Sequence, residues 1–121
     1  MSKRAFGTSA APLTPAIKVG STIYVSGQVP VDEHGAIKGS DVAAQTTQVL
    51  ENLERVLAAA GATRADVVKT LVILTDIKRD FAAMNAVYRD FFPEPLPARS
   101  TIGADLAIDV LVEIEAVAVV E

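Results

Sequence analysis

The 121-residue chain contains no cysteine, no tryptophan and a single histidine, His34. Without cysteine it has neither disulfides nor thiol chemistry, and redox usage gives no indication of its compartment. One histidine leaves almost no material for a histidine metal site or a Ser-His-Asp arrangement. No apolar run approaches the roughly 20 residues that cross a bilayer, and the first residues lack the apolar stretch of a secretory signal. These absences predict a soluble, cytoplasmic protein with no metal site.

Basic residues are outnumbered, because 11 Lys and Arg stand against 15 Asp and Glu, for a formal net charge of −4. Nucleic-acid-binding domains normally carry a basic patch, so this balance argues against nucleic acid as the main partner. Half of the residues are hydrophobic, which allows a real core in a chain of single-domain length. We therefore expect one domain over residues 1–121.

Hydrophobic patterning predicts elements in the order β-β-(β)-α-β-α-β-β. Strands are expected at residues 4–8, 22–26, 67–74, 98–102 and 110–120. Apolar positions with a 3.6-residue period predict helices from residue 41 to Gly61 and over 79–92. Two helices can cover one face of a mixed sheet, but the strands at 67–74 and 110–120 are too apolar to leave the other face in water. The pattern predicts an α+β fold that self-associates through the uncovered face.

Charged residues interrupt the apolar background near the C-terminus. Arg99 begins the strand expected at 98–102, while Glu113 and Glu115 point to one face of the strand expected at 110–120. If these two strands pair as a hairpin, Arg99 lies beside one of the carboxylates. Two interpretations are open. The pair is either a structural ion pair, or a guanidinium fork for a substrate carboxylate with a glutamate that handles protons or water.

Two further polar or flexible positions could belong to a site. Gly27 directly follows the strand expected at 22–26, where a glycine allows either a bulge or the close approach of a ligand. Asn85 lies one turn after Phe81, near the edge of the second helix's apolar stripe. It is either a solvated polar residue or part of a binding surface. Patterning alone does not decide between these interpretations.

Several stretches resemble the Rid family of reactive intermediate deaminases, also called the YjgF family. They are PARST at 97–101, VEIEA at 112–116, GSTIYVSGQVP at 20–30, and the segments at 41–63, 65–77 and 80–94. Together they cover roughly residues 15–121 in the family's order. The resemblance implies a chorismate mutase-like α+β fold, a mixed sheet with two helices on one face. It also implies a homotrimer with ligand clefts between adjacent subunits.

The resemblance further implies hydrolysis of reactive 2-imino and enamine acids, such as 2-aminoacrylate, to a 2-keto acid and ammonia without a cofactor. Arg99 would hold the substrate carboxylate, the backbone N–H of Thr101 would add a hydrogen bond, and Glu113 would position or activate the attacking water. The residues that would line the cleft are Ser26, Gly27, Asn85 and Leu13.

The chain departs from the family pattern at the pocket. Leu13, in Pro12-Leu13-Thr14, stands where many active members have a tyrosine, so a hydroxyl is missing there. The loop between Arg99 and Glu113 is one residue shorter than in many relatives. Two other functions therefore stand beside the deaminase. One is a non-catalytic trimer that binds a small carboxylate, and the other is a translation-related regulatory protein.

Overall fold

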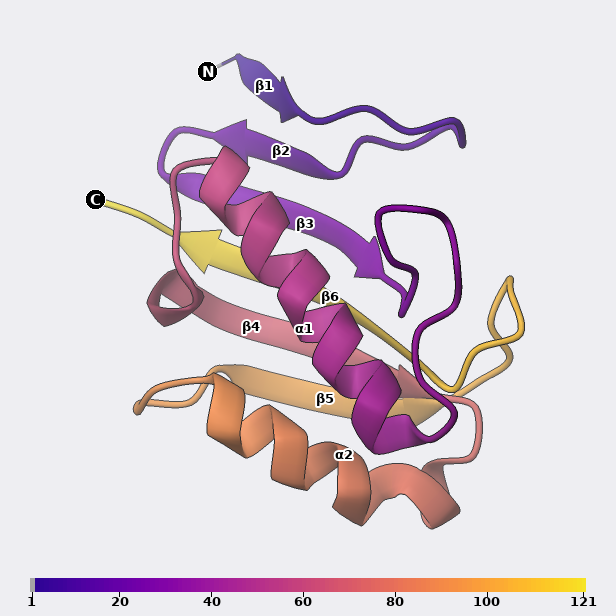
Figure 1. Ribbon diagram of the computed structural model, residues 1–121. Helices are drawn as coiled ribbons and strands as arrows, with labels where there is room; N and C mark the ends of the chain where they lie inside the picture. Colours follow the sequence, from indigo (N-terminus) through magenta and orange to yellow (C-terminus); the bar gives the residue numbers. More distant parts are fainter. Residues whose placement is uncertain (1) are drawn as a thin grey trace.

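The computed structural model describes residues 2–121 and contains one six-stranded sheet with two helices (Figure 1). The strands, in chain order, are β1 (Lys3–Phe6), β2 (Ala16–Val19), β3 (Thr22–Gln28), β4 (Val67–Leu74), β5 (Ala98–Gly103) and β6 (Val112–Val119). The helices are α1 (Val42–Ala59) and α2 (Ile77–Phe91), and a 3-10 turn, η1 (Arg64–Asp66), leads into β4. The sheet order is β1-β2-β3-β6-β4-β5, and β4 and β5 form its parallel pair.

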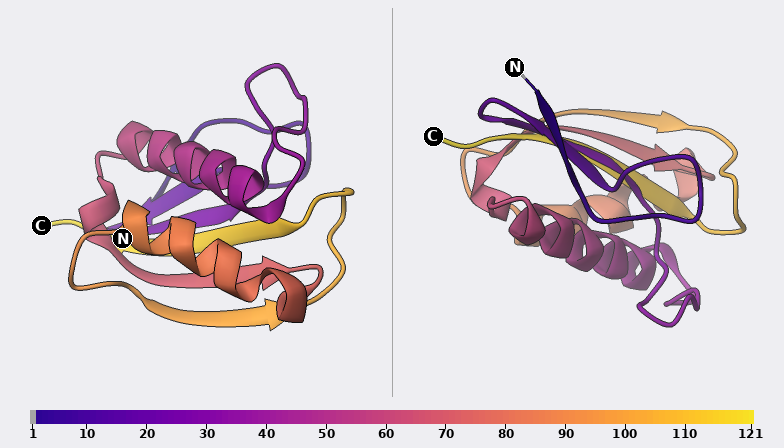
Figure 2. Two further views of the ribbon diagram at one scale, coloured as in Figure 1. Left: turned by 60° about the horizontal axis from the view of Figure 1, so that its bottom comes forward. Right: turned by 90° about the horizontal axis from the view of Figure 1, so that it is seen from above.

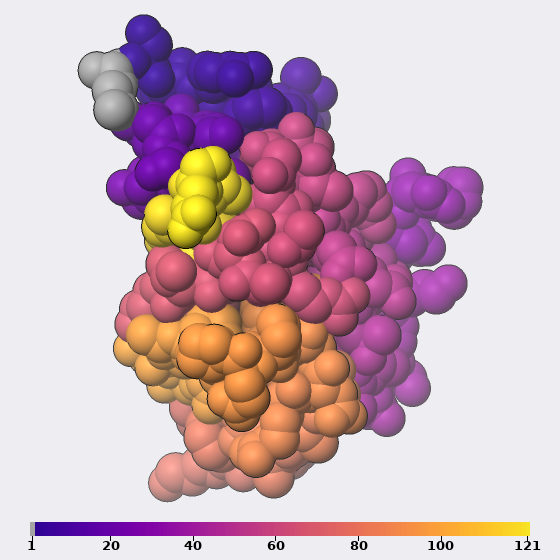
Figure 3. All heavy atoms as spheres, turned by 90° about the vertical axis from the view of Figure 1, so that its left-hand side faces the viewer, coloured from indigo at the N-terminus to yellow at the C-terminus, as the bar shows by residue number. Residues whose placement is uncertain are grey.

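Both helices lie on the same face of the sheet (Figure 2). The core fills the space between them, with Ile23, Val72 and Ile114 of the sheet against Leu53 and Leu57 of α1. Within residues 2–121 no second layer covers the other face. The C-terminal end lies at the surface, between the N-terminal strands and the segment that leads into β4 (Figure 3). No helix in this described part of the chain has the length and apolar character needed to cross a membrane.

Local sequence signals explain where the helices begin and end. The Asp41 side chain accepts a hydrogen bond from the N–H of Ala44 at 2.9 Å, which caps α1 as expected. Gly61, at φ +85°, adopts the left-handed conformation that ends the helix. Asp76 caps α2 by accepting from the N–H of Arg79 at 3.2 Å, so this helix starts two residues before the predicted 79.

The predicted hairpin of residues 98–102 with 110–120 is wrong, because β4 lies between β5 and β6. The helix-facing residues of β6 are all buried, whereas β5 is largely exposed. The more apolar strand therefore takes the centre of the sheet, over the helices, and the more polar one takes the edge. Closeness in sequence does not overcome this difference in burial.

Strand β3 carries a bulge near its end. Val25 pairs with Ala116 and Gln28 pairs with Ile114, so two residues of β3, Ser26 and Gly27, face a single residue of β6. The strand continues to Gln28, past the predicted end at residue 26. The bulge is one of the two roles that the sequence allowed for Gly27, and it brings this glycine to the face away from the helices.

Candidate functional site

The predicted site residues fall into two groups, and the first surrounds Arg99. Arg99 of β5 is in register with the buried Thr70 of β4 and points to the helix face. Its guanidinium carbon lies 4.8 Å from the ring centroid of Tyr88 and 5.6 Å from that of Phe81. Its Nη1 lies 4.0 Å from the sulfur of Met84. All three contacts are with α2.

A cavity of about 180 Å³ opens beside Arg99, and it brings Asn85 to the same place. Its lining residues are Asn85, Tyr88, Arg89, Leu96, Pro97 and Arg99. Within residues 2–121, Arg99 forms no ion pair with a carboxylate. Thr101, two residues along β5, lies in register with Val72 and is not part of the lining. The guanidinium donors are therefore open to an anionic ligand in this chain.

The second group surrounds Glu113, which lies on the face of β6 that points away from the helices. A Cβ at Gly27 would overlap Oε2 of Glu113 and lie 2.8 Å from its carboxyl carbon. The bulge and its glycine thus make room for this carboxylate. Burial raises the pKa of Glu113, and the nearby charge of Glu115 raises it further. A raised pKa brings a carboxylate closer to the range in which it exchanges protons with substrates near neutral pH.

Ser26 adjoins Gly27 of this second group, and Leu13 lines a neighbouring cavity that extends toward α1 and does not include Glu113. The Ser26 hydroxyl donates to the carbonyl of Thr14 at 2.6 Å, and its N–H donates to the carbonyl of Pro15 at 2.9 Å. These bonds tie the N-terminal loop to the bulge. Leu13, 52% exposed, lines a cavity of about 370 Å³ together with Ser26 and Gly27. Leu13, Ser26 and Gly27 are therefore neighbours, and the hydrogen bond to the carbonyl of Thr14 orients the Ser26 hydroxyl.

The two groups cannot meet on one small ligand within a single chain. Arg99 and Glu113 are two strands apart, which is about 10 Å across a sheet. Through Thr70, Arg99 aligns with Ala116, three residues and so about another 10 Å from Glu113 along the strands. Their side chains also point to opposite faces. The sequence placed Arg99 beside one of the two carboxylates, Glu113 or Glu115, on condition that the strands form a hairpin; that hairpin is absent, and both carboxylates lie on the other face of the sheet.

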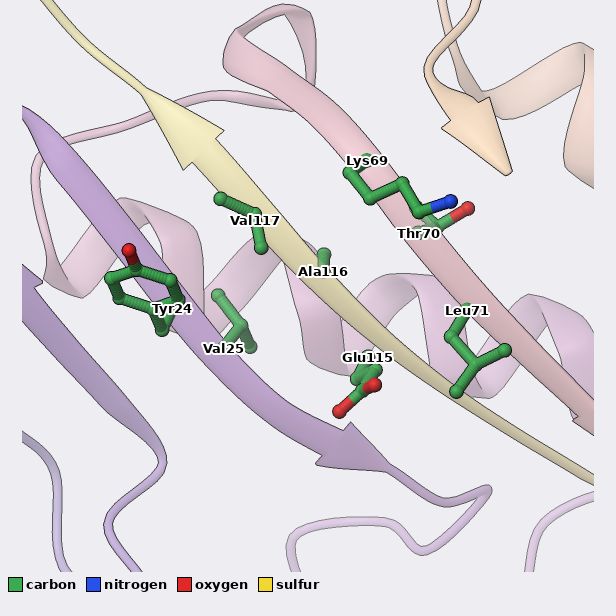
Figure 4. A pocket seen from close by; sticks show the side chains of 8 residues that line it. All are labelled: Tyr24, Val25, Lys69, Thr70, Leu71, Glu115, Ala116 and Val117. Atoms are coloured by element: carbon green, nitrogen blue, oxygen red, sulfur yellow. The ribbon is translucent and has the colours of Figure 1, made fainter. Parts of the chain in front are cut away.

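The open face of the sheet is partly apolar. Figure 4 looks onto this face, where Tyr24, Leu71 and Val117 project from three neighbouring strands with Lys69 and Glu115 beside them. The Tyr24 side chain is 53% exposed. Sequence patterning predicted that the strand at 67–74 is buried on both faces. In the single chain, Leu71 is only half-buried.

Sequence reasoning missed the aromatic residues that contact Arg99. It assigned Phe81 and Tyr88 to the apolar stripe of α2, although Phe81 is 41% exposed and its ring lies near the guanidinium. Tyr88 is buried, and its hydroxyl shares a 2.6 Å hydrogen bond with the Thr70 hydroxyl. The sequence contains one indication of the contact with Arg99. Phe81 and Tyr88 are seven residues apart and so share a face of the helix that precedes the strand of Arg99.

Comparison with known proteins gives the family. The model of the family described as Endoribonuclease L-PSP matches residues 3–120. The chain is a member of this YjgF/Rid family. The Escherichia coli YjgF gene product has a solved structure that matches with a TM-score of 0.90 and 39% identity, over 98% of this chain and 99% of that one. The predicted Rid fold is thereby confirmed, while the homotrimer stays a prediction.

Two Rid relatives are close in sequence. A RutC family protein of Pyrococcus abyssi is 48% identical over 109 residues, covering 88% of this chain and 85% of that protein. The 2-iminobutanoate/2-iminopropanoate deaminase of Salmonella typhimurium is 44% identical over 112 residues, covering 89% and 87%. The family therefore includes proteins named as imine deaminases.

Proposed function

We propose that this Rid protein is a hydrolytic deaminase of reactive 2-imino and enamine acids. The observation that carries the proposal is Arg99, whose guanidinium has no carboxylate partner within residues 2–121, beside Asn85 in a cavity of about 180 Å³. A planar fork of this kind matches a carboxylate with two parallel N–H groups. A cavity of this size suits a small acid better than a nucleic acid strand. The deaminase name of a relative at 44% identity supports the same class of substrate.

The reaction needs orientation, a placed water and one group that moves protons. Arg99 binds the carboxylate of the protonated imine. Water adds to the imine carbon, the π electron pair moves to nitrogen, and Glu113 accepts a proton from the water. Glu113 then returns that proton to the nitrogen. The carbon–nitrogen bond breaks as the hydroxyl oxygen forms the ketone, and its proton leaves with ammonia. The products are a 2-keto acid and ammonium.

The active site in this proposal is shared between copies of the chain. Arg99 and Glu113 lie on opposite faces of one sheet, so a substrate held by Arg99 meets the Glu113 of a second copy. The exposed Tyr24 and half-buried Leu71 and Val117 give the open face the apolar character of a surface that another copy covers. We propose a homotrimer in the cytoplasm, with Ser26, Gly27 and Leu13 joining Glu113 at each intersubunit cleft.

Mixing two inactive variants tests the shared site. Arg99→Ala and Glu113→Gln are each expected to lose turnover of imines made in situ by an amino-acid oxidase. When they are denatured together in equal amounts and refolded, about one quarter of the clefts should combine an intact arginine with an intact glutamate. Each cleft takes its arginine from one copy and its glutamate from another, and each of the two is intact in about half of the copies. Recovery of about that fraction supports the proposal. No recovery from correctly assembled mixed trimers contradicts a site between copies.

Separate measurements on each variant test the roles. Leaving a buried charged group unpaired typically costs about 2–5 kcal/mol, so Arg99→Ala should lower kcat/KM roughly 30- to several-thousand-fold. Arg99→Lys should be nearly as poor, because lysine lacks the fork. Arg4→Ala is the matched control, since Arg4 carries the same charge and also lies near an aromatic ring, that of Phe6, but does not line this cavity. Pyruvate binding without any turnover would favour the non-catalytic carboxylate-binding trimer instead.

A further inference from the structure

Within residues 2–121, the guanidinium of Arg99 contacts aromatic rings, and its hydrogen-bond acceptor is a sulfur and not an oxygen. Its guanidinium carbon lies 4.8 Å from the Tyr88 centroid and 5.6 Å from the Phe81 centroid, both within the range of cation–π attraction. In the described part of the chain, this acceptor is the Met84 sulfur at 4.0 Å, which is a weak one. A ring face restrains the plane of the guanidinium without using its N–H donors. A carboxylate neighbour would restrain it too, but would occupy the donors that a ligand needs.

Tyr88 is itself held rigidly. Its side chain is 4% exposed, and its ring packs against Phe92 with centroids 4.7 Å apart. Its hydroxyl and the hydroxyl of Thr70 share a buried hydrogen bond of 2.6 Å. Thr70 is the direct register partner of Arg99 on β4. The same pair of strands therefore sets the position of the guanidinium and of the ring that packs against it.

The Tyr88 hydroxyl is a structural group and not a proton donor for the reaction. Burial raises the pKa of Tyr88, against the smaller lowering effects of the Thr70 hydrogen bond and the Arg99 charge. The phenol therefore stays neutral under ordinary conditions, and its oxygen is engaged by Thr70. What Tyr88 presents to the cavity is its ring.

We propose that Tyr88 is a positioning residue, locked by Thr70, that holds the Arg99 guanidinium in the plane in which it binds the substrate carboxylate. This inference rests on the proposed carboxylate-binding role of Arg99. In this proposal a second, neutral residue contributes to substrate binding, the first step of the reaction. It also explains why lysine is a poor replacement at position 99, because an ammonium group has no plane for a ring to orient.

The test compares Tyr88→Leu with Phe6→Leu, a matched ring-to-aliphatic change at a ring that packs against the core and lies near Arg4 instead of Arg99. Pyruvate, the inert product-like acid, is titrated calorimetrically into each folded variant. Loss of the ring should weaken pyruvate binding about 2- to 30-fold and raise KM with kcat nearly unchanged. Phe6→Leu should lower the melting temperature and leave binding unchanged. Equal binding by Tyr88→Leu and the parent protein would overturn the inference.

Two further variants keep the test decisive if Tyr88→Leu does not fold. Phe81 is 41% exposed, so Phe81→Leu should fold, and it should weaken pyruvate binding about 2- to 5-fold. Tyr88→Phe keeps the ring, so it should bind pyruvate within about twofold of the parent while losing stability from the unpaired Thr70 hydroxyl. Parent-like binding by Phe81→Leu together with strongly weakened binding by Tyr88→Phe would contradict a role for the ring faces.

A double-mutant cycle separates this inference from the proposed function. In an Arg99→Lys background, Tyr88→Leu should add little to the binding defect, because the group that the ring orients is gone. An undiminished effect in that background would show that Tyr88 acts independently of Arg99. Parent-like pyruvate binding by Arg99→Lys itself would instead remove the carboxylate-binding role on which both rest. The Arg99 Nε–H proton resonance should also move in Tyr88→Leu and stay in place in Phe6→Leu, a readout independent of activity.

Discussion

Replacing Gly27 with alanine should separate stability from turnover. Gly27 is not among the glycines with positive φ, so alanine fits its backbone. The new Cβ, however, would lie 2.8 Å from the carboxyl carbon of Glu113. Carbon atoms in contact normally lie about 3.5–4.0 Å apart, so the carboxylate must move by about 1 Å. The atom that moves belongs to the end of a flexible side chain, which keeps the cost to the fold small.

The expected magnitudes differ for the two quantities. A glycine-to-alanine change at a compatible backbone position alters the free energy of unfolding by only about 0.4–1 kcal/mol. A displacement of about 1 Å in a catalytic group can cost about 100-fold in rate. We therefore expect Gly27→Ala to melt within a few degrees of the parent protein and to lose about 100-fold in kcat. Pyruvate binding, which depends on the Arg99 half of the site, should change far less.

The assay couples keto-acid release to an amino-acid oxidase, with urea unfolding measured on the same samples. Gly103→Ala is the matched control, because its Cβ would come 3.0 Å from Cγ2 of Ile77 and far from Glu113. It should lose stability and keep its turnover. A folded Gly27→Ala with parent-like kcat would refute the reasoning. In that case, an inactive Glu113→Gln would show that alanine at position 27 does not displace the carboxylate as expected. An active Glu113→Gln would show that the proposed role of Glu113 is wrong.

Three further predictions use other groups. Glu115→Gln removes a charge that raises the pKa of Glu113, so the acid limb of the kcat/KM profile should move to lower pH; an unmoved limb would show that Glu113 does not set it. The pKa of Glu113 is higher in the folded state than in the unfolded state, so Glu113 stabilises the fold at low pH and loses this contribution as the pH rises through its folded-state pKa. At pH values above the folded-state pKa, Glu113→Gln should therefore gain stability relative to the parent protein, as urea unfolding across pH would show. Asn52→Ala leaves the carbonyls of Val29 and Val31 without their 2.9 Å donors and should cost about 2–4 kcal/mol in urea unfolding, against almost no cost for the exposed Thr47→Ala.

Much of the fold follows from local patterns in the sequence. The strand predicted at 67–74 has the observed bounds of β4, and Asp41 caps α1 as its position before the apolar stripe indicates. Each of these features depends on a few neighbouring residues. The sequence also predicted two helices on one face of the sheet, because the apolar stripe of each helix is narrow and can be buried on one side only.

The arrangement of the site could not be predicted in the same way. The hairpin failed because strand order depends on which strands compete best for the centre of the sheet, a comparison over the whole chain. The approach of Gly27 to Glu113 requires a bulge in β3 and its register with β6, across 86 residues of sequence. The sequence supplied the candidate residues, and Asn85 does line the cavity of Arg99. Their division between two faces needed the structure.

The parallel pair of β4 and β5 has a consequence for how the protein assembles. Parallel neighbours require a crossover, and α2 supplies it, so Thr70, Asn85, Tyr88 and Arg99 all fall within the continuous segment 67–103. The largest sequence separation among these residues is that between Thr70 and Arg99, which is far smaller than the separation between Gly27 and Glu113, so bringing them together costs less loop-closure entropy. The surroundings of Glu113 instead gather segments from both ends of the chain. The guanidinium pocket of each chain is therefore built from one continuous segment, whereas the surroundings of the carboxylate require the N-terminal and C-terminal strands to be brought together.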